Sequence, residues 1–223
     1  QIVINAIEKK DLGIIVAPPG SGKTIVGLKI IADKKQPALI ITHRKQIADQ
    51  WIERIETFLG IPKNEIGKIG QGKTKIGKQI TVAMIQSLSK ELEKPDTGKI
   101  LNAFGTIIVD ECHHIPAETF RNAISKLQTF YLYGLTATPF RKYNDSKLIF
   151  IHLGEVIAEI KSNEISTSKR PKIIIRNTEL DVPFNSKTDK FETLSKILVH
   201  DSSRNKSILG DVINELQSDK KVV

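Results

Sequence analysis

The sequence predicts an α/β fold in which a mainly parallel sheet is flanked by helices, and three observations support this prediction. Short apolar runs, each long enough for one strand, recur along the chain. Helix-compatible sequence separates successive runs, as expected when crossover helices join parallel strands. A glycine-rich turn follows the first run and precedes a helix. The predicted strands cover residues 12–16, 38–41, 80–84, 106–109 and 130–135.

The glycine-rich turn, residues 17–24 (APPGSGKT), joins the first strand to an apolar helix predicted at residues 24–31. Its glycines allow backbone N–H groups to face an anion at the helix N-terminus. Lys23 can reach the β and γ phosphates of a nucleotide, and the Thr24 hydroxyl can ligate Mg²⁺. The alternative is a turn that only connects strand to helix. We predict an ATP site whose binding residues are Pro19, Gly20, Ser21, Gly22, Lys23 and Thr24.

A second segment, residues 67–74 (GKIGQGKT), fits the strict GxxxxGKT pattern better than the first, in which Ala17 replaces the leading glycine. Its surroundings are wrong for a nucleotide site, however. The sequence KIGKQ follows it where an apolar helix should begin, and a strand-like run then starts at Ile80. We therefore interpret this segment as a basic hairpin between strands.

Helices are further predicted at residues 2–7, 45–59, 86–92 and 117–127. The helix at 45–59 carries Ile47, Trp51, Ile55 and Phe58 at helical spacing, which is typical of a helix that buries one face. We therefore expect Trp51 to be a core residue rather than a stacking platform for a nucleic-acid base.

Two adjacent acids, Asp110 and Glu111, follow the apolar strand at residues 106–109. Open α/β sheets bind ligands at the carboxyl ends of their strands. Asp110 is placed to hold Mg²⁺ through its water shell, and Glu111 to orient or deprotonate the water that attacks a γ phosphate. Together with the turn at 17–24, the two acids predict a single Mg·ATP site.

The chain of 223 residues has a formal net charge of +9, which favours a polyanionic partner over a basic surface that serves solubility alone. Its one cysteine, Cys112, excludes an intrachain disulfide and a CxxC zinc module. No run of residues approaches the ~18 apolar positions of a membrane helix, so no membrane partner is expected. We predict a cytoplasmic protein, associated with the nucleoid if the source is prokaryotic.

The pattern changes after Gly154. A polar stretch at 161–170 and prolines at 171 and 183 interrupt any helix, and we place a linker at residues 161–189. A helical pattern returns from residue 190, and the chain stops as a new strand begins. We predict one domain at residues 1–160 and the truncated start of a second at 190–223, as in a fragment excised from a longer protein.

Three ordered motifs resemble those of the superfamily 2 helicases, and the resemblance covers residues 1–160. AxxGxGKT at 17–24 is similar to motif I, DECH at 110–113 to the DEAH-type motif II, and TAT at 136–138 to motif III. GLTATPFR at 134–141 and the opening glutamine resemble most the xeroderma pigmentosum group B and type III restriction enzyme R subunit group. The resemblance implies a RecA-like P-loop NTPase domain for 1–160 and the start of a second RecA-like domain for 190–223.

The resemblance also implies roles at matching positions. Gln1 is similar to the glutamine that reads adenine, and a plain N-terminal helix residue is the alternative. His113, Thr136 and Thr138 would couple the state of the γ phosphate to movement of the second lobe. The turns at 42–51 and 83–88 resemble segments that contact nucleic-acid phosphates. The candidate contacts are Arg44, Lys45, Gln86 and Ser87, with solvated helix starts as the alternative.

These observations predict the ATP-binding lobe of an ATP-dependent helicase or translocase. It would use ATP and Mg²⁺, act on nucleic acid with DNA favoured over RNA, and work with a second lobe. Because the arginine finger has no counterpart here, we expect the fragment alone to hydrolyse ATP weakly or not at all. Three alternatives remain: a duplex DNA translocase of a restriction system that separates no strands, a P-loop enzyme acting on a small molecule, and a nucleic-acid-binding module with a vestigial ATP site.

Overall fold

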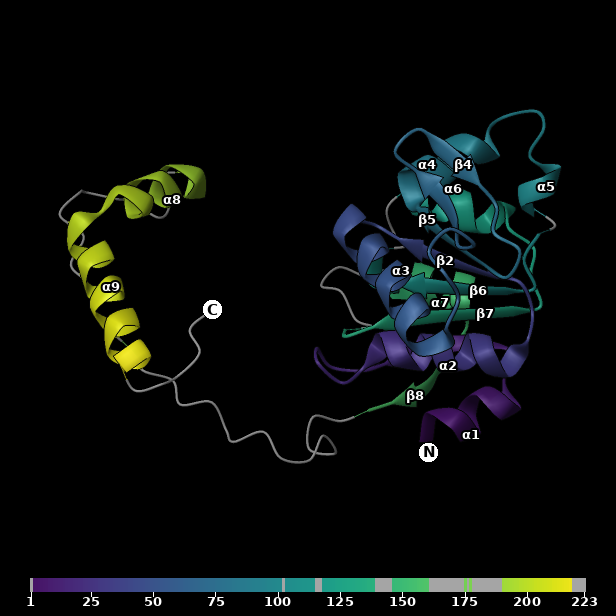
Figure 1. Cartoon of the computed structure of the whole chain (residues 1–223), viewed down its shortest axis with the longest axis horizontal. Coiled ribbons are helices and arrows are strands. Elements are labelled where there is room, and N and C mark those ends of the chain that lie inside the picture. Colours follow the sequence, from purple (N-terminus) through teal and green to yellow (C-terminus); the bar gives the residue numbers. More distant parts are fainter. Residues whose placement is uncertain are drawn as a thin grey trace. The chain divides into compact units, whose positions relative to one another are not determined.

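The computed structural model describes residues 2–101, 103–114, 118–138, 146–160, 175, 177 and 190–217. The chain divides into two units, Gln1–Thr167 and Ser168–Val223. The first unit holds the sheet with the helices α1 to α7, and the second holds α8 and α9 (Figure 1). The predicted linker at 161–189 lies outside the described residues apart from 175 and 177, so the division at residues 160 and 190 stays a prediction.

One sheet forms the centre of the first unit, and its strands in the described residues follow the order β4-β3-β5-β2-β6-β7-β1-β8. Every neighbouring pair is parallel except β3 and β4, so the predicted mainly parallel sheet is confirmed. The strand β8 was missed because its run is short and only partly buried. The strands are β1 (Leu12–Val16), β2 (Ala38–Thr42), β3 (Gly67–Gly70), β4 (Lys73–Lys75), β5 (Ile80–Met84), β6 (Thr106–Asp110), β7 (Tyr131–Thr136) and β8 (Val156–Glu159).

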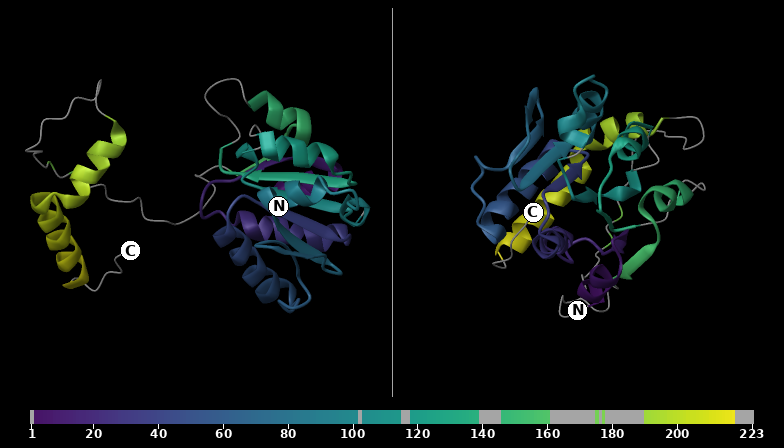
Figure 2. Two further views of the ribbon diagram at one scale, coloured as in Figure 1. Left: turned by 90° about the horizontal axis from the view of Figure 1, so that it is seen from above. Right: turned by 90° about the vertical axis from the view of Figure 1, so that its right-hand side faces the viewer.

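Helices cover both faces of this sheet, which gives three layers (Figure 2). One apolar cluster joins α4, α5, α6 and α7 to one face, and the other joins α1, α2 and α3 to the opposite face. The helical segments are α1 (Ile2–Lys9), α2 (Lys23–Lys34), α3 (Lys45–Leu59), α4 (Ile85–Leu92), α5 (Gly98–Leu101), the 3₁₀ turn η1 (Cys112–His114), α6 (Glu118–Lys126) and α7 (Ser146–Leu153).

The two covered faces explain why the central strands are apolar at every position rather than at alternate ones. In β6, Ile107 and Val109 belong to one cluster while Ile108 belongs to the other. The same alternation separates Leu39 from Ile40 in β2. A parallel sheet buried on both sides therefore follows directly from these runs.

Helix α3 packs as its spacing predicts, with one exception. Trp51 and Ile55 are buried, which confirms Trp51 as a core residue, whereas Phe58 is 57% exposed. Phe58 lies in the last turn of α3. Gly27 of α2 makes the close approach to α3 possible, because a Cβ atom there would lie 2.6 Å from the Trp51 ring.

The second glycine-lysine-threonine segment folds as the predicted hairpin. Strands β3 and β4 pair antiparallel, with Gly70 opposite Lys73. The two residues between them, Gln71 and Gly72, both have positive φ (55° and 73°). This is the conformation of a two-residue turn that matches the twist of a hairpin. Lys73 and Thr74 therefore lie in a strand and do not begin a helix.

The second unit contains α8 (Phe191–His200) and α9 (Ser202–Gln217), where the sequence predicts helices. The Asp201 carboxylate accepts a hydrogen bond from the Arg204 N–H (2.9 Å) and so caps the start of α9. None of the residues in these two helices is buried. Their assignment to a second RecA-like domain stays a prediction.

Every helix in the part of the chain that the structure describes is too short or too polar to span a lipid bilayer.

Candidate nucleotide site and neighbouring turns

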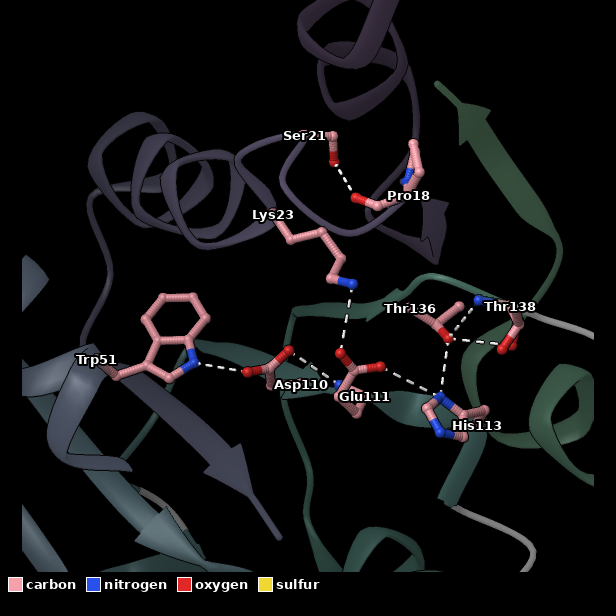
Figure 3. A network of polar contacts seen from close by, with 9 residues as sticks. All are labelled: Pro18, Ser21, Lys23, Trp51, Asp110, Glu111, His113, Thr136 and Thr138. Carbon is pink, nitrogen blue, oxygen red and sulfur yellow. Dashed lines mark hydrogen bonds and ion pairs between the residues drawn. The ribbon is translucent and has the colours of Figure 1, made fainter. Parts of the chain in front are cut away.

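The predicted site residues gather at one edge of the sheet because they follow neighbouring parallel strands. Strand β7 lies between β6 and β1, with Thr136 opposite Val16 and Leu135 opposite Asp110. The carboxyl ends of β1, β6 and β7 therefore bring the turn at 17–24, the two acids and Thr136 together (Figure 3). This juxtaposition is the one that the sequence predicts.

The turn at 17–24 is held by one hydrogen bond at its start and one within it. The Ala17 N–H donates to the Thr136 carbonyl (2.9 Å), and the Ser21 hydroxyl donates to the Pro18 carbonyl (2.7 Å). Gly20 and Gly22 both adopt the left-handed conformation, with φ of 78° and 86°. Helix α2 starts directly afterwards, so its first N–H groups, which lack intrahelical partners, face the edge of the sheet.

Lys23 and Glu111 form an ion pair across this edge. The Lys23 Nζ lies 3.3 Å from the Glu111 Oε1, and both side chains are largely buried. Glu111 has a φ of 49°, a left-handed conformation that is uncommon for a residue with a side chain. The chain turns sharply at this residue into η1, and the Glu111 carboxylate points toward Lys23 rather than along the strand (Figure 3).

Asp110 is the last residue of β6 and is only 7% exposed. Its Oδ2 accepts a hydrogen bond from the Trp51 Nε1–H (2.8 Å), and its Oδ1 accepts one from the Glu111 N–H (2.9 Å). Burial raises the pKa of the Asp110 carboxyl, and the hydrogen bond from Trp51 opposes that rise. Trp51 is thus a core residue with a polar function, which apolar spacing alone could not show.

We predict that replacing Trp51 with phenylalanine weakens Mg²⁺-dependent nucleotide binding several-fold. Phenylalanine keeps an aromatic ring in the core but removes the donor, which leaves a buried carboxylate oxygen without a partner at a cost of ~1–3 kcal/mol. The measurement is the affinity for a fluorescent ATP analogue with and without Mg²⁺. The control is Ile55→Val, which removes a methylene group from the same buried face of α3 and lowers the free energy of unfolding by ~0.5–1.5 kcal/mol. This variant should leave the effect of Mg²⁺ on binding unchanged.

A chain of polar contacts leads from Glu111 to the third motif. The His113 Nδ1 lies 3.3 Å from the Glu111 Oε2 and 3.0 Å from the Thr136 Oγ1. The Thr136 hydroxyl donates to the Thr138 carbonyl (3.0 Å) and accepts from the Thr138 N–H (3.1 Å). Since the single hydroxyl proton is already used, we assign the shared proton to the His113 Nδ1. Of the predicted coupling residues, His113 therefore contacts the predicted catalytic acid directly, and Thr136 and Thr138 are linked to that acid through His113.

The nucleic-acid candidates lie at the next strand ends along the same edge. Strand β2 lies between β5 and β6, with Thr42 opposite Met84. Arg44 and Lys45 begin α3 after β2, while Gln86 and Ser87 lie in the first turn of α4 after β5. The Gln86 side chain contacts the His43 carbonyl (3.5 Å), so the two turns are in contact.

Three histidine rings that contact one another at tilted angles connect these turns to the nucleotide edge, and the sequence did not predict this connection. The rings of His43 and His114 lie 4.4 Å apart, and those of His114 and His113 lie 4.3 Å apart. Burial and the nearby Arg44 lower the pKa of His43. The spacing of His113 and His114 gave no signal for this contact, because His43 follows β2, which is distant in sequence and adjacent to β6 only in the folded sheet.

The side chains present fit a hydrated divalent cation and a triphosphate. Thr24, in the first turn of α2, and Asp110 supply the oxygen atoms that Mg²⁺ prefers, and Lys23 supplies a compact positive charge. A Cβ atom at Gly20 would meet no atom within 4 Å, so the turn leaves open space beside it. Pro19 is exposed in the same turn, and Gln1 lies outside the described residues.

Comparison with known proteins identifies the family of this chain. The family model described as "Type III restriction enzyme, res subunit" matches residues 1–141. The chain belongs to this family. The stated resemblance to superfamily 2 helicases of the xeroderma pigmentosum group B and type III restriction group is thereby confirmed.

Individual relatives are similar to this family member over part of their length. It is 31% identical over 195 residues to "DNA 3'-5' translocase XPB2" of Sulfurisphaera tokodaii, covering 87% of this chain and 42% of the relative. It is 29% identical over 154 residues to "Putative DNA 3'-5' helicase Rad25" of Halobacterium salinarum, covering 69% of this chain and 25% of the relative. The chain thus spans less than half the length of either.

Solved structures establish the fold. The helicase domain of Hef from Pyrococcus furiosus matches with a TM-score of 0.60 at 20% identity, covering 74% of this chain and 39% of that one. The UvsW helicase from bacteriophage T4 matches with a TM-score of 0.58 at 20% identity, covering 70% of this chain and 58% of that one. The predicted RecA-like fold of the first unit is confirmed.

Proposed function

We propose that this chain is the ATP-binding lobe of a nucleic-acid-dependent ATPase that moves along DNA. The convergence of Lys23, after β1, with Asp110 and Glu111, at the end of β6, is the observation that carries this proposal. A P-loop enzyme acting on a small molecule would share these three residues. The adjoining turn after β2, which carries Arg44 and Lys45, and the turn after β5, which carries Gln86 and Ser87, support the nucleic-acid function. Relatives named as DNA helicases and translocases favour DNA over RNA.

The residues of the site suggest how ATP would be processed. Bound Mg²⁺ would neutralise the β and γ phosphate oxygens, with Asp110 and Thr24 holding it. Lys23 would leave Glu111 for the phosphates, since both compete for the same ammonium group. The released Glu111 carboxylate would then accept a proton from the attacking water. The ion pair therefore holds the base inactive until phosphates replace it.

The contacts around His113 would change when Lys23 moves from Glu111 to the phosphates. When Glu111 leaves Lys23, its second oxygen remains next to the His113 Nδ1, which also donates to Thr136. A change in the position of Glu111 would thus alter the hydrogen bonds of the third motif. We propose that Thr136 and Thr138 pass this change to a second lobe, which would also supply the arginine finger worth about 10³ to 10⁵ in rate.

Movement along DNA without strand separation is a second candidate. A relative that covers 87% of this chain is named a translocase, whereas others are named helicases. Both activities would use the residues described above, and the discriminating groups would lie in other parts of the parent protein. Strand-separation and duplex-tracking assays on the parent protein would distinguish them.

A binding experiment tests the proposed function. We expect the 223-residue chain to bind a labelled single-stranded DNA, and Arg44→Gln/Lys45→Gln to reduce the slope of log affinity against log salt by ~0.7 for each lost phosphate contact. Fluorescence anisotropy at several salt concentrations measures this slope. Lys9→Gln/Arg54→Gln removes the same charge from exposed positions on α1 and α3 and should change the slope little.

Failure of the wild-type chain to bind any polynucleotide, together with intact ATP binding, would favour a P-loop enzyme that acts on a small molecule. Equal slopes for the two double variants would show that Arg44 and Lys45 in the turn after β2 do not contact phosphates.

A further inference from the structure

The hairpin of β3 and β4 places lysines at the outer edge of the sheet, where no nucleotide site is formed. Strand β4 is the terminal strand in the sheet order, and all its residues are exposed. Lys73 begins this strand directly after the tight turn at Gln71 and Gly72. The hairpin therefore presents charge to solvent and has no helix start behind it.

A cavity of about 480 Å³ lies between this hairpin and α4, which are neighbours in Figure 1. Its lining is polar, with three lysines, one glutamate, and small residues that leave the space open. The residues that line it are Gly70, Gly72, Lys73, Thr74, Ser87, Lys90, Glu91 and Lys94.

The charge of this cavity is unbalanced. The Lys94 Nζ lies 2.6 Å from the Glu91 Oε1. This hydrogen bond, with a smaller contribution from Thr74, lowers the pKa of Glu91. The carboxylate is thus already satisfied. Among the described residues, Lys73 and Lys90 have no acidic partner, so two positive charges remain for a ligand. The cavity is therefore suited to an anion.

The lining favours the backbone of a nucleic acid over a free nucleotide. A triphosphate site needs helix N–H groups and a carboxylate for the metal, whereas here Lys73 lies in a strand and Glu91 is paired. The turns after β2 and β5 together form the proposed DNA track. The cavity adjoins this track, because Ser87 belongs to both and its neighbour Gln86 contacts the carbonyl of His43. A strand crossing the turns after β2 and β5 would next meet these lysines.

We propose that the cavity between the β3–β4 hairpin and α4 binds phosphodiester groups of the DNA strand through Lys73 and Lys90. This proposal rests on the proposed function and extends its DNA track by one further element. The second glycine-lysine-threonine segment is then a site for polynucleotide phosphates and not for ATP. Lysines act here as point charges, which suits contacts that carry no sequence information.

The test compares charge removal at the cavity with charge removal elsewhere. Lys73→Gln/Lys90→Gln should lower the affinity of the 223-residue chain for single-stranded DNA by roughly 25-fold at ~0.1 M salt, because each phosphate contact contributes a slope of ~0.7. Lys73→Arg/Lys90→Arg should retain the wild-type slope. The matched control, Lys9→Gln/Lys147→Gln, removes two exposed lysines from α1 and α7 and should leave affinity near the wild-type value.

Each outcome separates this inference from the proposed function. If the Lys73/Lys90 variant matches the control while Arg44→Gln/Lys45→Gln loses affinity, the cavity is not a DNA contact and the proposed function stands. If the Lys73/Lys90 variant loses binding of an ATP analogue instead, the cavity is a nucleotide site and this inference is wrong. If the wild-type chain binds no DNA, both fail.

Discussion

Lys23→Ala is expected to weaken ATP binding by about 10- to 150-fold, the factor that corresponds to the ~1.5–3 kcal/mol of a hydrogen bond to a charged group. Lys23 is the first residue of α2 and lies at the edge where the three strand ends meet. The loss should exceed that for any other lysine in the part of the chain that the structure describes, because among those lysines only Lys23 lies next to both the glycine turn and the acids. Titration with a fluorescent ATP analogue in the presence of Mg²⁺ measures it.

The matched variant for this experiment is Lys73→Ala. It removes a lysine from the segment that fits the strict GxxxxGKT pattern but folds as a hairpin. We expect ATP binding to be unchanged in this variant. The opposite result, with binding lost in Lys73→Ala and retained in Lys23→Ala, would assign the nucleotide to the hairpin.

Glu111→Gln is expected to have opposite effects on hydrolysis and on binding. The chemical step should slow by ~10² to 10⁴, the usual contribution of a positioned base. ATP binding should become equal or tighter, since Lys23 no longer pairs with a carboxylate at 3.3 Å. Single-turnover hydrolysis with the chain in excess over ATP measures the rate even where it is slow, and equilibrium titration measures the affinity.

The control for this change is Glu53→Gln, which neutralises an exposed acid on α3. It should alter neither the rate nor the affinity. A Glu111→Gln variant that hydrolyses ATP at the wild-type rate would exclude Glu111 as the base and would revive a vestigial ATP site. A variant that binds ATP more weakly would show that the Lys23–Glu111 pair supports the site and does not compete with phosphates.

Local patterns predicted most of the first unit. The central strands were predicted from apolar runs, and the helices from the spacing of apolar residues. Both signals arise from residues that are close together along the chain. The hairpin at 67–75 was predicted from the sequence that follows Thr74, and not from its glycine-lysine-threonine motif. Strand β8 was missed because it is short and lies at the edge of the sheet, paired only with β1.

The sequence predicted which residues belong to the candidate site but not which of their side chains are in contact. Motif order indicated that Lys23, Asp110 and Glu111 belong together. The hydrogen bond from Trp51 to Asp110 joins positions 59 residues apart, and the ring contact between His43 and His114 likewise joins the ends of two different strands. No spacing rule relates such pairs, because their distance depends on the order of strands in the sheet.

By itself, the sequence determined which turns follow buried strands, which residues in those turns carry charge, and which of two similar loops precedes a helix. Only the tertiary structure decided that Trp51 supports Asp110, that Glu111 holds Lys23, and that the hairpin and α4 enclose a basic cavity. The physical reason is that strand and helix patterns are set by residues a few positions apart. Contacts between side chains instead depend on how the strands are ordered and paired, which the chain fixes only when the whole sheet is assembled.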